Sequence, residues 1–288
     1  MKHTKVLLGF PWYNGPDVDT FTFYFELIHY FGRMFERSLW VEWLDKQVDK
    51  YGAECPLPDY ALDALPKLNS INPDDRSAEI TFNDEVFHFW IAAEPGYSLP
   101  GKTREMIVER GLAEGCEWLL MWDDDMTFDL STFLRLYRHQ KPVVAALAFT
   151  ARDPQQPVIY RMKEKWDEIN KIPFYDSETV WDYPKDQLIG DEDVGGVLTF
   201  GTGVVLINLN VFKQIPKPWF ASTGCGEDFH FCVRCHLHGI PRYVDTSVKT
   251  LHKPRKFPEW YGEDRYWRVR EQYPEVYKKL MSGELKTA

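Results

Sequence analysis

Positive charge, long apolar runs and cysteine are all scarce in this sequence. Lys and Arg number 34 against 44 Asp and Glu, which gives a net charge of −10. A field of that sign repels polyanions and weighs against nonspecific nucleic-acid binding. No stretch is long and apolar enough to span a membrane, and the apolar run in "MKHTKVLLGFPWYNG" is too short for a signal peptide. We therefore expect a cytoplasmic protein with no transmembrane segment.

Five cysteines are an odd number in a sequence without an export signal, so we expect reduced thiols and no disulfide framework. The stretch "CGEDFHFCVRCHLH" sets Cys232 and Cys235 beside His236 and His238, which loosely resembles a zinc site. Its second half is predicted to be one helix, on which these side chains point in several directions. The pattern therefore does not favour structural zinc.

Apolar and aromatic residues, in contrast, are plentiful. The 288 residues are 44% hydrophobic and 16% aromatic, with 11 Trp, which is enough for a sizeable core. This much Trp and Tyr favours flat stacking surfaces for sugars, bases or a partner, although large aromatic residues also serve in cores and interfaces.

Apolar runs alternate with helical patterns through the first 150 residues. Strands are expected at about 5–10, 85–93, 117–122 and 142–149, and helices at about 19–37, 103–114 and 130–139. This alternation is typical of α/β proteins, and it predicts a Rossmann-like, mostly parallel central sheet flanked by helices. Ligands of such sheets bind beyond the carboxyl ends of the strands.

The rest of the chain is less regular. Residues 38–84, broken by prolines, and residues 150–196, which are polar and aromatic, are expected to be insertions without a clear pattern. A loop and helix follow Gly226, and a last strand is expected at 241–248. Residues 260–280 read as one amphipathic helix. We predict one domain over 1–255 and a C-terminal helical tail over 256–288.

Three aspartates directly follow an apolar strand in "LLMWDDDMTF". Asp123 and Asp125 have the D-x-D spacing that can hold one Mg²⁺ or Mn²⁺ ion, with substrate phosphates completing its shell. On an extended strand these two carboxylates share a face and Asp124 points the other way, whereas in a turn the pairing is less certain. The alternative is a helix cap in a solvated loop, where Asp is common.

Two other stretches contain residues suited to the same chemistry. In "GEDFHF", Glu227 and Asp228 fall at a predicted helix start, where the dipole favours their ionised forms and a base can be held in position. Alone they read as an ordinary cap. His252 follows the last predicted strand, where it can complete a metal shell.

In the order of these elements the sequence resembles the nucleotide-sugar-dependent glycosyltransferases of the GT-A fold, in particular the family-2-like branch found in bacteria and phages. The matching stretches are "KVLLGFPWYNG", "KTREMIVERGLAEGCEWLLMWDDDMTF", "KPVVAALAFTARDPQQP", "GTGVVLINLNVF" and "GEDFHFCVRCHLHGIPRYVDTSVKTLH". They cover most of Lys5 to His252 apart from the two insertions. The order is more specific than any single motif.

The resemblance implies a divided active site. Asp123, Asp125 and His252 would bind Mn²⁺ or Mg²⁺ against the donor diphosphate, with Asp125 the most direct ligand. Asp228 would be the catalytic base and Glu227 would help to orient the acceptor. An attacking hydroxyl activated by a base on the face opposite the leaving diphosphate implies inversion at the anomeric carbon.

The resemblance also implies contacts to the nucleotide. Pro11, Trp12 and Tyr13, after the first strand, would border the base. Arg104 would lie near the nucleotide or its phosphates, and Asp124 near the ribose or the sugar.

Two stretches remain open to two interpretations. "GTG", Gly201 to Gly203, permits close backbone approach or an unusual turn on the acceptor side, but it also suits a plain tight turn. In "KTLHKPRKF", Lys253 and its basic neighbours either clamp the diphosphate or form a solvated loop. The adjoining His252 favours the phosphate role.

The sequence thus predicts a metal-dependent glycosyltransferase of the hexosyltransferase type, with a UDP-sugar as donor. The acceptor is a glycan or a hydroxylated base in phage DNA, for which the aromatic and basic "YWRVREQYPEVYKK" offers stacking surfaces. One alternative is a sugar-1-phosphate nucleotidyltransferase, although "PWYNGPDVDT" lacks the basic residue expected in its Gly-rich loop. The other is a non-catalytic nucleotide-sugar-binding protein.

Overall fold

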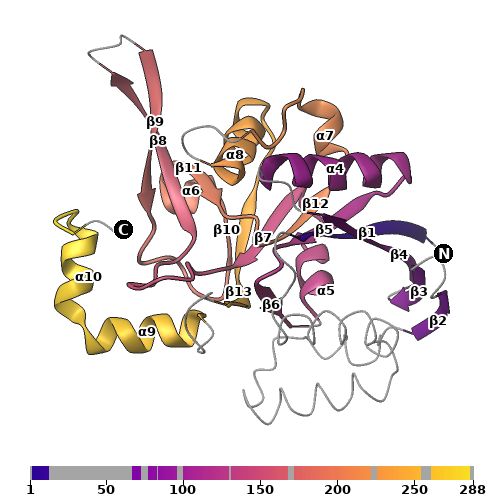
Figure 1. Ribbon diagram of the computed structural model, residues 1–288, viewed down its shortest axis with the longest axis horizontal. Coiled ribbons are helices and arrows are strands. Elements are labelled where there is room, and N and C mark those ends of the chain that lie inside the picture. The colour runs from indigo at the N-terminus through magenta and orange to yellow at the C-terminus, as the bar shows by residue number, and fades with distance from the viewer. Residues whose placement is uncertain are drawn as a thin grey trace.

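The structure is a computed structural model that describes most of the chain (Figure 1). The described residues are 2–12, 67–72, 77–82, 84–95, 100–129, 131–167, 172–221, 226–253 and 261–285. The helix expected at about 19–37 lies outside them. None of the described helices is long and apolar enough to cross a membrane.

A large mixed sheet forms the centre of the fold. Its strands follow the order β10-β13-β7-β12-β5-β1-β4-β3-β2, with β6 paired to β13. The strands β4, β1, β5, β7 and β13 run in one direction, and β12 runs against its neighbours β5 and β7. The bounds are β1 Lys2–Trp12, β2 Lys67–Asn72, β3 Ser77–Phe82, β4 Glu85–Pro95, β5 Trp118–Trp122, β6 Met126–Phe128, β7 Val143–Leu147, β10 Leu188–Ile189, β12 Val204–Asn208 and β13 Tyr243–His252. The predicted α/β class with a mostly parallel central sheet is confirmed.

Helices cover both faces of this sheet, which is why its central strands are apolar throughout and do not alternate with polar residues. On β1, Val6 and Leu8 pack in one core cluster and Leu7 in the other. Figure 1 shows α4 and α8 on one side and α5 on the other. The helix bounds are α4 Pro100–Ala113, α5 Thr132–Tyr137, α6 Asp191–Val194, α7 Val211–Gln214 and α8 Glu227–Leu237.

The segment 150–196 differs from the irregular insertion that was expected. It contains β8 (Ile159–Asp167) and β9 (Ile172–Thr179), which pair antiparallel, and β8 also pairs with β11 (Val197–Phe200) in a separate three-stranded sheet. The alternation of charged residues along β8 and β9 hid these strands. Arg161 forms an ion pair with Glu178 directly opposite it, and Lys165 forms one with Asp176 diagonally across the two strands, so charged pairs stand where an apolar face was expected.

The expected single tail helix is also wrong, because the chain forms two helices, α9 (Glu263–Gln272) and α10 (Pro274–Met281). Proline has no N–H to donate and suits the first turn of a helix, so Pro274 ends one helix and begins the next. Buried hydrogen bonds join these helices to the loop before β8: Gln155 Nε2 donates to the Gly262 carbonyl at 2.8 Å, and the Tyr277 hydroxyl to the Gln155 carbonyl at 3.0 Å.

Glu263 connects α9 to the body of the fold. Its buried carboxylate accepts hydrogen bonds from Tyr183 at 2.7 Å and Trp267 at 3.2 Å, and it pairs with Lys249 at 2.7 Å. Burial raises the pKa of Glu263, but the hydrogen bonds from Lys249 and Tyr183 outweigh it, so the pKa lies below its usual range. A carboxyl with a lowered folded-state pKa stabilises the fold above its unfolded pKa, and this contribution is lost as the pH falls.

Glu263→Gln is therefore expected to lower the free energy of unfolding near neutral pH by about 2 kcal/mol, since it weakens hydrogen bonds to a charged group. The difference from the wild type should shrink below about pH 4, where the unfolded carboxyl is protonated. Urea unfolding at several pH values measures both effects. Asp264→Asn, at the exposed neighbouring carboxylate, is the control and should change stability little. A pH-independent loss in the Glu263 variant would contradict this ionic role.

Candidate functional site

The predicted site residues come from segments that meet at one edge of the sheet. Asp123 directly follows β5 and His252 ends β13, so both lie at the carboxyl ends of strands that run in the same direction. Because β12 runs the opposite way, it begins at this edge and brings Gly203 beside Asp123, whose N–H donates to the Gly203 carbonyl at 2.9 Å. This is the edge at which sheets of this type bind ligands.

A tight turn after β5 decides where the aspartates point. The Met126 N–H donates to the Asp123 carbonyl at 3.1 Å, which closes the turn, and the chain continues as β6. Strand β6 pairs antiparallel with β13, with Met126 opposite His252. The Lys253 N–H donates to the Asp125 carbonyl at 2.8 Å. The turn thus places Asp125, and not Asp123, beside the end of β13.

His252 faces Asp125 with one nitrogen and the backbone with the other. Its Nδ1 lies 2.8 Å from the Phe149 carbonyl oxygen, and its Nε2 lies 3.2 Å from Asp125 Oδ2. A carbonyl only accepts hydrogen bonds, so Nδ1 carries a proton. Nε2 can then face a carboxylate only if a proton or a cation lies between the two atoms.

The raised pKa of His252 agrees with a proton lying between its Nε2 and the Asp125 carboxylate. Burial lowers this pKa, but the hydrogen bond to Asp125 and the charge of that carboxylate outweigh burial, so it lies above the ordinary value for histidine. The neighbouring carboxylate thus favours the protonated imidazole of His252. Both side chains retain some solvent exposure, which leaves them accessible to an ion.

Arg104 occupies the centre of the site. On the same helix, Gly101 lets α4 pack closely against the segment containing Phe220, because a Cβ there would overlap the Phe220 carbonyl oxygen. The Arg104 guanidinium is 3% exposed and donates to Asp123 Oδ1 at 2.8 Å. Its Nε lies 3.5 Å from Asp228 Oδ1 and 3.7 Å from Glu227 Oε1. Arg104 thus joins the end of β5 to the start of α8.

Carboxylates outnumber cations in these contacts. The ion pairs of Arg104 and His252 involve four carboxylates, those of Asp123, Asp125, Glu227 and Asp228. Burial raises the pKa of Asp123 well above its usual range; Arg104 opposes this effect, whereas Asp228 and Asp125 add to it. A partly buried group of this kind gains from a further positive charge.

Asp228 is held by a residue that the sequence did not single out. The Thr202 hydroxyl donates to Asp228 Oδ1, the oxygen that also faces Arg104. The other oxygen, Oδ2, is directed toward Gly201, where an added Cβ would lie 3.6 Å from it. One carboxylate oxygen is thus fixed by a hydroxyl and a guanidinium, while the second faces the space beside Gly201.

The two glycines of "GTG" have different surroundings. A Cβ on Gly201 would come within 2.8 Å of Val158 Cγ1, which identifies a close approach of two segments. A Cβ on Gly203 would make ordinary contacts with Met126 at 3.5 Å. Neither glycine has the positive φ of a left-handed turn. Of the interpretations open from the sequence, close approach fits Gly201, and Gly203 requires no special explanation.

The remaining predicted positions lie next to this group along the chain or at the end of β1. Asp124 lies in the turn after β5, Lys253 follows His252, and the backbone of Pro11 and Trp12 ends β1. Tyr13 lies outside the described residues. Within the described part of the chain, no three His, Cys, Asp or Glu residues form a cluster able to hold a metal ion. Asp123 is engaged with Arg104, so Asp125 and His252 form the pair that remains for a metal.

Three of the five cysteines lie in the described part of the chain, and they take no part in the ion pairs above. Cys232 and Cys235 are free and buried on α8, and burial raises the pKa of both, that of Cys232 to about 12. Cys116 is likewise a free, buried thiol. Protonated, buried thiols are poor metal ligands, so these three do not offer a zinc site.

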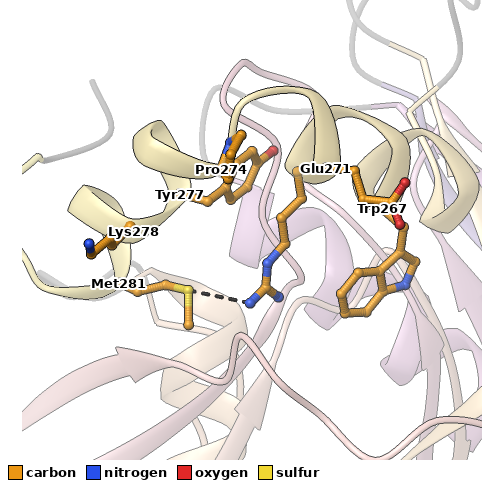
Figure 2. Close-up of a pocket in the computed structure, with 7 residues that line it drawn as sticks. Trp267, Glu271, Pro274, Tyr277, Lys278 and Met281 are labelled. Carbon is orange, nitrogen blue, oxygen red and sulfur yellow. Dashed lines mark hydrogen bonds between the residues drawn. The ribbon is translucent and has the colours of Figure 1, made fainter.

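A hollow of about 530 Å³ lies at the elbow between α9 and α10 (Figure 2). It is lined by Trp267, Arg270, Glu271, Pro274, Tyr277, Lys278 and Met281. Lys185 lies 3.8 Å from the centre of the Trp267 ring, and Arg270 bonds Asp182 at 2.8 Å. None of the predicted site residues lines it. Within the hollow, Arg270 already lies over the Trp267 ring, 5.2 Å from its centre.

Comparisons with known proteins give no family for this chain. No family model matches the sequence, and no curated protein matches it significantly. Among solved structures, A197 from STIV is similar with a TM-score of 0.45 and 13% identity, over 86% of this chain and 85% of that one. UDP-glucose phosphorylase from Trypanosoma brucei is similar with a TM-score of 0.20 and 16% identity, over 39% of this chain and 23% of that one. At these scores the likenesses assign no function to the chain.

Proposed function

We propose that this chain is a metal-dependent glycosyltransferase that moves a sugar from a nucleoside diphosphate sugar, a UDP-sugar, to an acceptor hydroxyl with inversion. The observation that carries the proposal is the group of four carboxylates around Arg104 and His252 at the carboxyl edge of the sheet. Such a group combines a place for a cation with a base close to it, as this reaction requires.

The donor atoms of Asp125 and His252 fit a divalent cation. Two ligands at right angles around an octahedral ion lie about 3 Å apart when each bond is about 2.1 Å, and Asp125 Oδ2 lies 3.2 Å from His252 Nε2. The bond from Nδ1 to the Phe149 carbonyl is the kind of outer contact that orients histidine ligands. When bound, Mn²⁺ or Mg²⁺ would neutralise charge on the diphosphate oxygens as they leave.

Side chains of this protein would remove the proton from the acceptor hydroxyl. Asp228 would accept the proton of the acceptor hydroxyl at Oδ2, with Thr202 and Arg104 holding Oδ1. The acceptor oxygen forms its bond to the anomeric carbon from the face opposite the diphosphate. The bond from that carbon to the diphosphate oxygen breaks, and the leaving oxygen keeps the electron pair. Glu227, on the same helical turn, would help to orient the acceptor.

For Arg104, which the resemblance placed near the nucleotide or its phosphates, the contacts support a further role. Its guanidinium is buried and directed at carboxylates on two elements. We therefore assign it to holding Asp123 and Asp228 in place. The acceptor remains a glycan or a hydroxylated DNA base, and a nucleotidyltransferase or a non-catalytic nucleotide-sugar-binding protein remains the alternative function.

A thermal-shift screen of nucleotide sugars with and without Mn²⁺ tests this proposal. A ligand that binds the folded state raises its stability by mass action, by about 2.7 kcal/mol at a hundred times the Kd. We expect a UDP-sugar to raise the Tm only when Mn²⁺ is present, and the same mixture to release UDP slowly by hydrolysis. Binding without turnover would favour the binding-protein alternative, and release of pyrophosphate from UTP and a sugar-1-phosphate would favour the nucleotidyltransferase.

A further inference from the structure

The strand β8 lies against the proposed base. It pairs with β11, with Tyr160 opposite Thr199, and β11 leads directly into Gly201 and Thr202. At the start of β8, Val158 approaches Gly201 so closely that a Cβ on the glycine would meet it at 2.8 Å, and the same point lies 3.6 Å from Asp228 Oδ2. The free oxygen of the base therefore faces the beginning of β8.

Tyr160 is the next residue of β8 after Ile159 and lies on the Asp228 side of the strand. Its ring packs edge-on against Phe229, with the ring centres 4.8 Å apart, and Phe229 directly follows Asp228. Burial raises the pKa of Tyr160, Arg152 opposes this effect and the charge of Asp228 adds to it, in keeping with a phenol close to the base.

Tyr160 is half-buried, and its ring contact with Phe229 leaves its hydroxyl available to bond water or a ligand. Buried tyrosine hydroxyls usually have a protein partner, whereas a half-buried one can bond water that a ligand displaces. The buried hydroxyls of Tyr183 and Tyr277, for comparison, bond Glu263 at 2.7 Å and the Gln155 carbonyl at 3.0 Å. A ligand group beside Asp228 can bond the Tyr160 hydroxyl in place of water.

We propose that Tyr160 is an acceptor-binding residue, whose hydroxyl bonds the acceptor while its ring and Val158 form the wall beside Asp228. The proposal rests on the function proposed above and assigns part of acceptor recognition to β8. The segment that was expected to be an irregular insertion would thus contribute to acceptor binding through β8. Tyr160 takes no proton in the reaction.

The test separates transfer to a sugar from transfer to water. The donor is whichever of UDP-glucose, UDP-galactose and UDP-N-acetylglucosamine gives the largest thermal shift with Mn²⁺. The acceptors are the methyl glycosides of glucose, galactose, mannose and N-acetylglucosamine. Tyr160→Phe is expected to lower kcat/KM for the glycoside roughly tenfold, the effect of one lost hydrogen bond, while the donor KM and the rate of hydrolysis stay within about twofold.

Tyr160→Trp keeps an aromatic ring but fills the space of the acceptor, so it should block transfer to glycosides and spare hydrolysis. Tyr243→Phe is the matched control. This tyrosine is also half-buried, but it lies at the start of β13, packed against Lys141, whereas His252 of the candidate site ends that strand. Unchanged transfer in both Tyr160 variants, or an equal loss of transfer and hydrolysis, overturns the inference. If the wild type only hydrolyses the donor, a glycoside that inhibits hydrolysis by the wild type but not by Tyr160→Trp supports the inference, and equal inhibition of both proteins overturns it.

The two proposals fail in different ways. A wild-type protein that turns over none of the three donors refutes the proposed function, and the role of Tyr160 falls with it. An active wild type whose Tyr160 variants behave like Tyr243→Phe refutes the role of Tyr160 alone.

Discussion

Asp228→Asn is expected to reduce sugar transfer by about 10² to 10⁴-fold, the usual contribution of a general base. Asparagine still offers an oxygen to the Thr202 hydroxyl, so the local structure should persist, but it cannot accept the acceptor proton. Steady-state kinetics should show the loss in kcat, and the thermal shift given by a UDP-sugar with Mn²⁺ should be largely retained.

Glu227→Gln is the matched control for this variant. It removes the same charge from the same surroundings, because Glu227 also faces Arg104, at 3.7 Å. A role in orienting the acceptor predicts a smaller effect, mainly on the acceptor KM. If the two variants lost activity equally, general electrostatics would explain the result, and near-normal activity of Asp228→Asn would remove this residue from the proton transfer.

Asp125→Ala should abolish metal-dependent turnover of the donor. It removes one of the two groups facing the proposed ion and leaves His252 without its carboxylate. Asp125→Asn keeps the shape and one oxygen, so we expect it to raise the Mn²⁺ concentration needed for half-maximal activity by 10-fold or more. Titration of activity with Mn²⁺ at saturating donor gives this value.

Asp129→Asn serves as the control for the metal prediction. Asp129 lies in the same segment, but its carboxylate accepts hydrogen bonds from the N–H and the hydroxyl of Ser131 and supports the start of α5. Asparagine keeps an oxygen that can accept these hydrogen bonds, so we expect little change in stability and no change in the Mn²⁺ requirement. A normal requirement in Asp125→Asn would exclude Asp125 as a ligand.

The sequence was most informative where a strand is buried on both faces. The runs around Leu7, Leu120 and Val144 are apolar throughout because helices cover both sides of the sheet, and they were predicted with small errors at their ends. The strands β8 and β9 were missed, since their charged residues satisfy each other across the hairpin and leave no apolar pattern.

It was easier to predict which residues form the candidate site than to predict which of them contact each other. The spacing of Asp123 and Asp125 suggested a shared ion, but a turn after β5 directs one to Arg104 and the other to His252. That division depends on the register of β6 against β13, which no local pattern records. The hydrogen bond from Thr202 to Asp228 was not predicted, because the glycines on either side of Thr202 suggested only a turn or a close backbone approach.

The pairing of β6 with β13 also bears on how the protein folds. It brings together residues that are more than a hundred positions apart, and contacts of this kind form late, because closing a long loop costs entropy before the contact repays it. A folding intermediate that lacked β13 would have Asp125 without His252. Mn²⁺ should therefore slow unfolding while leaving the rate of refolding almost unchanged.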